Sequence, residues 1–365
     1  MLRAIAFNLG VLVCLTCVTF KCHAFVVQPA RARCFHKKYR SPSTRTVGSN
    51  TSSTQLPATL PREQEVVDDV APDAQTMSEV LAAAVHAASE AGTIMKVKLG
   101  ADVIKTKFNP KDLLTEVDSE CQRAIERVVS SNFPDHSLLG EESVAPGAEA
   151  STVALRQALQ GGEGGGAAVD GADWLWVVDP IDGTTNFVHG MPLSAVSIGI
   201  AYRGKVVIGC IYDPFRDELF TATRGNGAFL NGLQMNVGDQ TTIGEATVAC
   251  GAPPGALALG PCVRGMAKLA PHVRTTRMLG SAAIMLAWVA CGRLTCYWEP
   301  DLNSWDIAAG SLLIQEAGGE MTDIDGSPYT LSTRAIIGSN KLVHEEIRNI
   351  LMEADASRPD LTPQL

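Results

Sequence analysis

The sequence predicts a layered α/β fold, because helical and strand-like patterns alternate along most of the chain. Apolar residues recur at helical spacing between residues 81 and 95, and large apolar residues occupy every second position between 196 and 202. A continuous apolar run over residues 174–178 has the length of a buried strand. With 365 residues the chain can form one large domain or two smaller ones. Interleaved helices and sheets of this kind pack as layers around an apolar core.

The first 24 residues have the organisation of a signal peptide. Arg3 precedes an apolar stretch over residues 4–20, and residues 21–24 end in small residues suited to cleavage. A membrane anchor is the competing interpretation, but the stretch is short for spanning a bilayer and contains three polar residues. We therefore expect no membrane segment in the mature protein.

A second targeting segment follows the first. Residues 25–62 are rich in Ser, Thr and basic residues and contain no Asp or Glu, which is typical of a transit peptide. Residues 63–75 contain Pro, Glu and Asp and are expected to be a linker, so that transit peptide and linker together span 25–75. This arrangement resembles the bipartite presequences of algae with secondary plastids. Plastid import is therefore expected, and secretion is the alternative.

The charge of the chain is unevenly distributed. The net charge is −9, but residues 1–62 hold nine Lys or Arg and no acid, which leaves 21 basic and 39 acidic residues, or −18, in the remainder. Such an acidic body argues against nonspecific binding of nucleic acid. Its six cysteines form no Cys-x-x-Cys pair, which gives little support to a zinc site.

Two helices are predicted at the start of the body. Residues 76–79 fit a capping box, and the helix that follows is expected to face inward with Leu81, Val85, Ala88, Gly92 and Met95. A second helix is predicted over residues 118–132, with Cys121, Ile125, Val128 and Val129 facing inward. The glycine-rich stretch within residues 144–173 predicts a surface insertion with no chemistry of its own.

Hairpin strands and further helices follow. Strands are predicted over residues 196–202 and 206–212, and again over 218–223 and 228–230 around an Asn226-Gly227 turn. The C-terminal part is predicted to contain a helix over 281–291, a strand over 294–298, a helix over 305–317, a strand over 335–339 and a helix over 343–352.

The octapeptide at residues 179–186, Asp-Pro-Ile-Asp-Gly-Thr-Thr-Asn, is the most informative stretch of the chain. It follows the apolar run directly, so a buried strand delivers Asp179 and Asp182 to its C-terminal end. Carboxylate oxygens suit hard cations such as Mg²⁺, and a metal cluster beside a hydroxyl group can hydrolyse a phosphate ester. A surface turn is the competing interpretation, because Asp, Pro, Gly and Asn all favour turns.

Two further acidic sites lie beside apolar segments. Glu141 and Glu142 follow the pair Leu138-Leu139, and Asp306 opens a predicted helix. Taken singly, a solvated loop explains the glutamates, and the helix dipole explains an acid in a first turn. Taken together, three such sites favour a metal centre.

These motifs resemble those of the inositol monophosphatase family, above all its plastid and bacterial-type members. The matching segments occur in the family's order at residues 112–118, 140–143, 176–187, 279–283 and 305–310. The resemblance covers residues 76–355 and implies the alternating α-β-α-β-α sandwich of the inositol monophosphatase and fructose-1,6-bisphosphatase type. It also implies a metal-binding half over 76–235, a substrate-side half over 236–355 and a tail over 356–365.

The resemblance implies two to three Mg²⁺ ions and inhibition by Li⁺. Glu141, Asp179 and the Ile181 carbonyl match the ligands of a first metal, and Asp179, Asp182 and Asp306 match those of a second. A third, weaker ion would also use Glu141. A backbone carbonyl is a hard oxygen ligand like the carboxylates, and an aspartate that bridges two ions holds them close together, as two-metal phosphate chemistry requires.

Catalytic and substrate-binding positions also follow from the resemblance. Asp118 and Thr184 match the pair that orients the attacking water, beside Glu141. Two other residues, Lys107 and Glu142, match family positions near the metal. The positions that match contacts to the phosphate or to the alcohol of the substrate are Gly183, Thr184, Thr185, Gly280, Ser281, Ala282 and Glu299. His189 matches no ligand position and is expected to be structural.

The activity that the resemblance implies is Mg²⁺-dependent hydrolysis of inositol monophosphate or a similar small polyol phosphate, with a homodimer expected from the resemblance alone. Histidinol phosphate, galactose 1-phosphate and bisphosphate nucleotides are alternative substrates of the same superfamily. An aspartyl-phosphate enzyme is disfavoured, because that chemistry uses Asp-x-Asp and the acids here are three residues apart. A non-catalytic protein that binds metal or phosphate is the alternative of another class.

Overall fold

The computed structural model describes residues 72–106, 113–160, 173–253 and 255–360. Residues 1–71 of the expected presequence and Lys107 lie outside these residues. The last residues of the expected linker, 72–75, are described, and a helix already begins at Ala74. The described residues belong to one compact unit, Val66–Leu365. No helix within them is both long and apolar enough to cross a bilayer.

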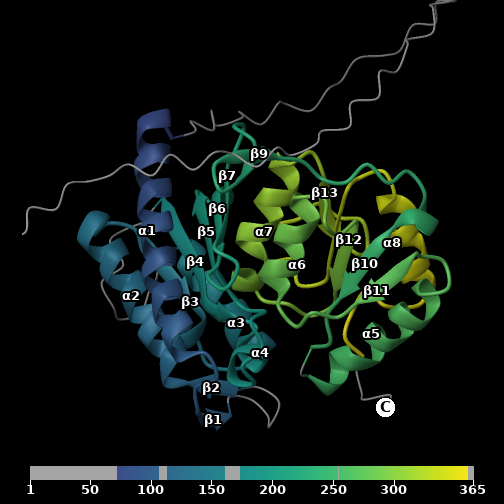
Figure 1. Ribbon diagram of the computed structural model, residues 1–365, viewed down its shortest axis with the longest axis horizontal. Helices are drawn as coiled ribbons and strands as arrows, with labels where there is room; N and C mark the ends of the chain where they lie inside the picture. Colours follow the sequence, from purple (N-terminus) through teal and green to yellow (C-terminus); the bar gives the residue numbers. More distant parts are fainter. Residues whose placement is uncertain (1–71, 107–112, 161–172, 254, 361–365) are drawn as a thin grey trace, which may run out of the picture. The chain divides into compact units, whose positions relative to one another are not determined.

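Helices α1 (Ala74–Lys98) and α2 (Glu116–Asn132) form the first layer (Figure 1). The N-terminus of α1 differs from the expected capping box, because the carboxylate of Asp73, three residues upstream, accepts a 3.0 Å hydrogen bond from the Thr76 amide. Four of the eight buried residues of α1 are alanine, and the expected core residues Leu81 and Val85 are only half-buried. In α2 the four expected core residues are all buried.

The second layer is a seven-stranded sheet in chain order: β3 (Ser137–Gly140), β4 (Trp174–Asp182), β5 (Ala195–Tyr202), β6 (Lys205–Asp213), β7 (Glu218–Thr223), β8 (Ala228–Leu230) and β9 (Leu233–Met235). Strands β3 and β4 pair in parallel, and the later neighbours pair antiparallel. The predicted hairpins are therefore confirmed.

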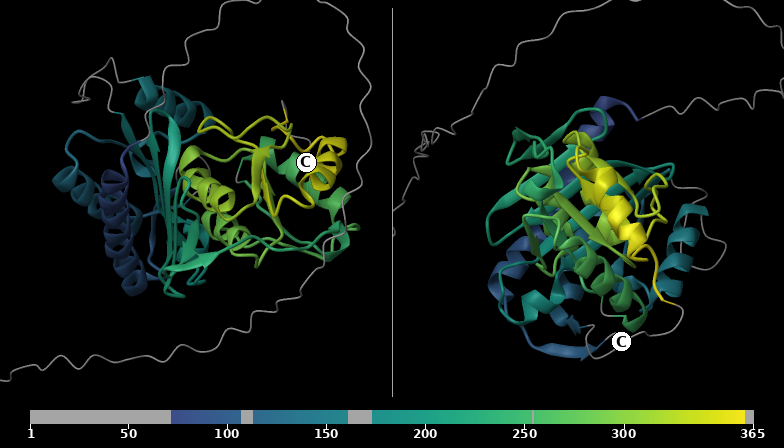
Figure 2. Two further views of the ribbon diagram at one scale, coloured as in Figure 1. Left: turned by 90° about the horizontal axis from the view of Figure 1, so that it is seen from above. Right: turned by 90° about the vertical axis from the view of Figure 1, so that its right-hand side faces the viewer.

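Helices α6 (Ala282–Ala290) and α7 (Ser304–Glu316) form the third layer, on the opposite face of this sheet from α1 and α2 (Figure 2). Strands β5 and β6 are consequently buried on both faces, unlike a half-exposed strand. The paired glycines Gly199 and Gly209 allow α7 to approach closely. A Cβ atom at these positions would lie 2.5 Å from the Ala308 side chain and 2.6 Å from the Ala309 carbonyl oxygen, respectively.

A five-stranded sheet forms the fourth layer, in the order β11 (Thr275–Arg277), β10 (Thr247–Cys250), β12 (Cys296–Glu299), β14 (Ile336–Ser339) and β13 (Glu320–Asp323). Helices α5 (Ala256–Leu269) and α8 (His344–Glu353) form the fifth layer and pack against each other on its outer side. The alternating α-β-α-β-α sandwich is therefore confirmed.

Short elements connect the layers: β1 (Val103–Thr106), β2 (Leu113–Thr115), α4 (Thr184–Val188) and the 3₁₀ turns η1 (Glu141–Ser143) and η2 (Ile243–Glu245). The expected insertion contains helix α3 (Ala148–Gln160), so it is not all loop. Leu155 of α3 joins the apolar core, and Arg334 donates a 3.0 Å hydrogen bond to the Ser151 hydroxyl. The segment is thus partly integrated into the fold, because an amphipathic helix buries its apolar face.

Candidate metal centre and active site

Two strand ends place acidic residues at one edge of the seven-stranded sheet. Gly140, the last residue of β3, pairs with Val178 in the parallel β3–β4 ladder. Glu141 comes directly after Gly140, and Asp179 comes directly after Val178 in β4. Carboxyl ends of parallel strands meet at the same edge of a sheet, which is why segments nearly forty residues apart in sequence contribute to one site.

A bulge in β4 brings Asp179 and Asp182 to the same side. Asp179 pairs with Ser197 and Asp182 with Ala195, so three steps along β4 oppose two steps along β5. In a regular strand, residues three apart point to opposite faces. The extra residue shifts the alternation by one, as a β-bulge does, and both carboxylates can then face one point.

The N-terminus of α6 binds the Asp182 carboxylate. The Ser281 hydroxyl and the Ala283 amide (2.9 Å) donate to Oδ2, and the Ala282 amide (3.2 Å) donates to Oδ1. Ser281 also caps α6, since its Oγ accepts from the Ile284 amide at 3.2 Å. Ser281 and Ala282, which the sequence resemblance assigns to the substrate, therefore both contact Asp182.

Asp306 enters the site from the first turn of α7. Its Oδ2 accepts a 2.7 Å hydrogen bond from the Asn303 amide, and the two residues form a capping box. Carboxylate oxygens of Asp179, Asp182 and Asp306 lie within 4.8 Å of one another. The three residues come from two layers of the fold and converge on one point.

The electrostatics of this cluster are unfavourable for negative charge. Burial raises the pKa of Asp182 to about 6, opposed by the hydrogen bonds from Ser281 and the α6 amides and reinforced by the charge of Glu141. Burial, followed by the charges of Glu141 and Asp182, raises the pKa of Asp306 well above its usual range. In the part of the chain that the structure describes, neither Asp182 nor Asp306 forms a salt bridge with Lys or Arg.

This arrangement fits a divalent cation. The donors are hard carboxylate oxygens, they converge from three residues, and their mutual repulsion would be relieved by a bound positive charge. Asp179, Asp182 and Asp306 would be direct ligands. Glu141 lies close enough to act on the pKa of two of them, but it is not part of the three-carboxylate group.

Thr184 lies between Asp118 and the Ile181 carbonyl. Its hydroxyl is 3.3 Å from Asp118 Oδ1 and 3.1 Å from the Ile181 oxygen. The other carboxylate oxygen of Asp118 accepts from both the amide (2.9 Å) and the hydroxyl (2.6 Å) of Thr115. Asp118 is thus held by the capping box of α2 with one oxygen directed to Thr184. The Ile181 carbonyl, a predicted metal ligand, contacts the same hydroxyl.

The remaining predicted substrate positions differ in their exposure to solvent. Gly183 has a φ of 90° and opens the five-residue helix α4, of which Thr185 is exposed. Gly280 is exposed just before α6. Glu299 ends β12 and is 6% exposed; burial raises its pKa to about 8, and the hydrogen bond from Tyr297 opposes that shift.

Two positioning residues were not predicted from the sequence. The Asn186 side-chain amide donates to the Leu193 and Leu279 carbonyls, both at 2.7 Å, and so ties the octapeptide to the loop before α6. The Gln122 oxygen accepts from the Glu142 amide at 2.9 Å and holds the glutamate turn in place. Asn186 could have been noticed within the octapeptide, whereas Gln122 carries no sequence signal in mid-helix. His189, expected to be structural, is exposed at the end of α4.

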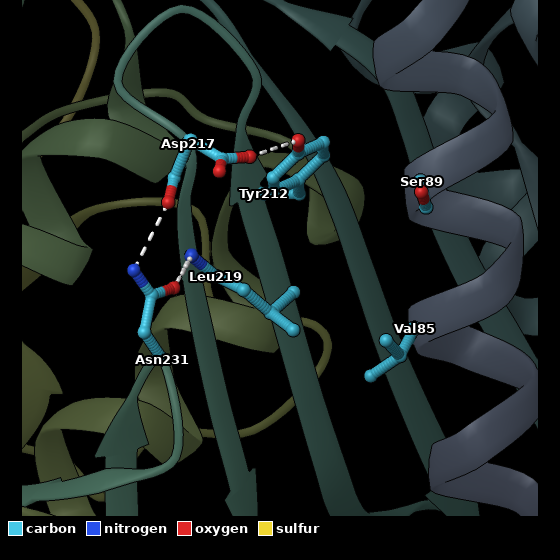
Figure 3. A pocket seen from close by; sticks show the side chains of 6 residues that line it. All are labelled: Val85, Ser89, Tyr212, Asp217, Leu219 and Asn231. Carbon is cyan, nitrogen blue, oxygen red and sulfur yellow. Dashed lines mark hydrogen bonds between the residues drawn. The ribbon is translucent and has the colours of Figure 1, made fainter. Parts of the chain in front are cut away.

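A separate cavity of about 280 Å³ lies between α1 and strands β6 and β7 (Figure 3). Its polar groups bond to one another: the Tyr212 hydroxyl donates to Asp217 at 2.8 Å, and the Asn231 amide donates to the Asp217 carbonyl at 3.0 Å. None of the predicted site residues lines this cavity.

The profile of the "Inositol monophosphatase family" matches residues 76–355. The chain belongs to the inositol monophosphatase family. It is 35% identical over 282 residues to "Inositol monophosphatase 2" of Solanum lycopersicum, an alignment that covers 76% of this chain and 100% of the relative. It is 37% identical over 271 residues to "Nus factor SuhB" of Pseudomonas aeruginosa, covering 72% of this chain and 92% of that protein.

Solved structures of the inositol monophosphatase family share the fold. The structure of SaIMPase-II with bound inositol monophosphate superposes with a TM-score of 0.58 at 29% identity, covering 75% of this chain and 94% of that chain. Membership of the inositol monophosphatase family makes this protein a phosphatase, in a family that depends on metal ions. Its acidic cluster is the part of the described structure that could hold such ions.

Proposed function

We propose that the protein is a Mg²⁺-dependent phosphomonoesterase that hydrolyses inositol monophosphate, and that Li⁺ inhibits it. The observation that carries the proposal is the convergence of Asp179, Asp182 and Asp306 within 4.8 Å, beside the Thr184 hydroxyl. Bound Mg²⁺ would neutralise the phosphate and activate a water for attack on phosphorus.

The chain's own residues position the reactants. Asp118 accepts a hydrogen bond from the Thr184 hydroxyl, which leaves the lone pairs of the Thr184 oxygen to accept a hydrogen bond from the attacking water. Glu141 is next to the cluster and completes the acidic wall around that water. Glu299 is a buried acceptor for hydroxyl groups of the alcohol.

The names of similar proteins support the substrate. The Solanum lycopersicum relative is named an inositol monophosphatase, and the SaIMPase-II structure contains inositol monophosphate. Histidinol phosphate, galactose 1-phosphate and bisphosphate nucleotides remain competing substrates, because the metal ligands would serve any phosphate ester. A non-catalytic metal-binding or phosphate-binding role is opposed by the placement of Thr184 beside Asp118.

Phosphate release from a panel of esters tests this proposal. The purified protein, without residues 1–71, is incubated with inositol 1-phosphate, histidinol phosphate, galactose 1-phosphate and a bisphosphate nucleotide, with Mg²⁺ or with excess chelator. We expect inositol 1-phosphate to have the highest kcat/KM, and chelator to abolish turnover. Full turnover in chelator would contradict the metal requirement, and a higher kcat/KM for another ester would reassign the substrate.

We also propose plastid targeting through residues 1–75 and a homodimeric state. The first rests on the basic, acid-free sequence of residues 1–62, and the second on the family alone. N-terminal sequencing of the native protein that found Met1 intact would contradict the first, and a monomer mass in solution would contradict the second.

A further inference from the structure

Residues from three parts of the fold surround the Glu299 carboxylate or support its surroundings: strand β12, the residue that follows β10, and helix α5. Tyr297 and Glu299 are two residues apart on β12, so their side chains share one face of the strand, and the Tyr297 hydroxyl donates to Glu299 Oε2. Both side chains are buried, Tyr297 completely. In the described part of the chain, Glu299 has no other hydrogen bond, so Oε1 is available to a ligand.

Gly251 provides the space in which this carboxylate lies. Strands β10 and β12 run parallel with Cys250 opposite Trp298, so Gly251 comes directly beside Glu299. A Cβ atom at position 251 would lie 1.6 Å from Glu299 Oε2 and 2.3 Å from Oε1. The carboxylate therefore occupies the volume that any other side chain at 251 would fill.

Cys262 of α5 fixes the position of Gly251. Its buried thiol donates to the Gly251 carbonyl at 2.6 Å. This contact connects the fifth layer to the end of β10. A helix, a strand end and a neighbouring strand thus hold one carboxylate, which lies close enough to the acidic cluster for the charge of Asp182 to act on it.

We infer that Tyr297, Gly251 and Cys262 are positioning residues that fix the Glu299 carboxylate and thereby make the enzyme selective for phosphate esters whose alcohol carries hydroxyl groups. The inference rests on the proposed function. A carboxylate with one oxygen held by Tyr297 offers the other in a single orientation, so less rotational freedom is lost when a substrate hydroxyl binds. An ester without such hydroxyls gains nothing from this arrangement.

Two substrates separate this role from a merely structural one. The kcat and KM values of the wild-type enzyme and of Tyr297→Phe are measured with inositol 1-phosphate and with 4-nitrophenyl phosphate, which has no polyol hydroxyls. We expect Tyr297→Phe to lower kcat/KM for inositol 1-phosphate about tenfold, mainly through KM, because the hydrogen bond that orients the Glu299 carboxyl group is lost. For 4-nitrophenyl phosphate, kcat/KM should change by less than about twofold.

A double-mutant cycle tests whether Tyr297 acts through Glu299. In a Glu299→Ala background, Tyr297→Phe should cause no further loss with inositol 1-phosphate, because coupled residues are non-additive.

Gly251→Ala should give the same selective loss as Tyr297→Phe. If one of these two variants folds poorly, the other still tests the inference. Tyr202→Phe is the matched control, since the Tyr202 hydroxyl also donates to a carboxylate, that of Asp173 at 3.2 Å, at the opposite end of the sheet. It should leave both substrates unchanged.

Failure of the inference and failure of the proposed function have different signatures. If the wild-type enzyme releases phosphate from neither ester, the proposed function is contradicted and the inference with it. The inference alone is overturned if the wild-type enzyme cleaves both esters and Tyr297→Phe lowers kcat/KM equally for the two. It is also overturned if Tyr297→Phe lowers kcat/KM as much in the Glu299→Ala background as in the wild type.

Discussion

The Thr184 hydroxyl has one proton and two acceptors within reach, and this limits what the residue can do. The Ile181 carbonyl is 3.1 Å away and Asp118 Oδ1 is 3.3 Å away. If a cation binds the Ile181 carbonyl, that oxygen becomes a poorer acceptor, and the proton shifts toward Asp118. Asp118 is already fixed by two hydrogen bonds from Thr115. Thr184 is therefore suited to orienting a water and Asp306 to holding the metal.

Asp306→Asn and Thr184→Ala should consequently fail in different ways. Asp306→Asn removes a charge from the three-carboxylate cluster, so both Mg²⁺ affinity and turnover should fall, and turnover should partly recover at high Mg²⁺. Thr184→Ala should lower turnover by about a hundredfold, with Mg²⁺ affinity little changed, because a misplaced water slows the chemical step. Calorimetric titration with Mg²⁺ measures affinity independently of turnover.

The same two measurements can contradict this division of labour. Equal recovery of both variants at high Mg²⁺ would mean that Thr184 also supports metal binding. A Thr184→Ala enzyme with nearly wild-type turnover would remove Thr184 from the mechanism. Thr93→Ala is the control, since Thr93 is an exposed threonine of α1 whose hydroxyl donates to the Ser89 carbonyl of the same helix.

At the residue scale, the sequence predicted the carboxylates of the acidic cluster but not the residues that donate hydrogen bonds to them. Asp179, Asp182 and Asp306 could be predicted because each follows or opens an apolar element. That Ser281 donates to Asp182, 99 residues away, could not be predicted, because this contact exists only when α6 packs against the end of β4. Sequence reasoning therefore assigned Ser281 to the substrate without its structural partner.

At the scale of elements, the close contact between α7 and the seven-stranded sheet determines where Asp306 lies. Gly199 and Gly209 remove the side chains that would separate the two layers. Asp306 is in the first turn of the same helix, so a shift of α7 away from the sheet would move it relative to Asp179 and Asp182. Packing in the core and geometry of the metal centre are thus coupled through one helix.

Gly209→Ala tests this coupling. The added Cβ would lie 2.6 Å from the Ala309 carbonyl oxygen, so α7 must move, and we expect a loss of about 1–3 kcal/mol in the free energy of unfolding. Urea unfolding measures that loss, and Mg²⁺ affinity should fall with it. As a control, Gly225→Ala adds a methyl group with no atom within 4 Å, although its φ of 78° disfavours alanine. If Gly209→Ala lowers stability but leaves Mg²⁺ affinity unchanged, the packing of α7 on the sheet does not determine the geometry of the metal centre.

Local patterns explain which elements were predictable. Strands β5 to β8 are joined by short turns, so their periodicity and their turn residues lie next to each other in the sequence. Strands β10 and β11 have four and three residues, too few for a periodic signal, and were missed. Helix α5 was missed as well, and it contains Pro261, which normally indicates the end of a helix.

At the scale of the whole molecule, the alternation of helix and strand predicted layers, but their order came from the family resemblance. Strands β10 and β12 pair although they are more than forty residues apart, and β14 enters between β12 and β13. Such pairing depends on which surfaces bury the most apolar area after collapse. Periodicity within a single segment does not indicate which strands will pair with one another.

Global stability should depend on pH through His136, which is stacked between Phe133 and Trp174 with centroid distances of 4.6 and 5.2 Å. Its Nδ1 accepts a 3.0 Å hydrogen bond from the Trp176 indole, so the folded state needs the neutral ring. Burial lowers the pKa of His136 to about 4, against about 6.5 in the unfolded chain. Between these values the unfolded state binds the extra proton, so stability is lost as pH falls from 6.5 toward 4.

Replacing His136 isolates this contribution. The carboxyls of Asp182 and Glu299 have raised pKa values and give the metal-free protein the opposite trend, stability being lost as pH rises through their range. His136→Gln removes the imidazole while those carboxyls remain, so the difference between the two proteins reports the histidine. Between pH 7.5 and 5.0, wild type should lose about 1 kcal/mol more than His136→Gln in urea unfolding, after allowance for partial solvent exposure. His272→Gln, at an exposed site, should follow wild type. Parallel pH curves for wild type and His136→Gln would mean that the folded protein tolerates a protonated His136 within its aromatic stack.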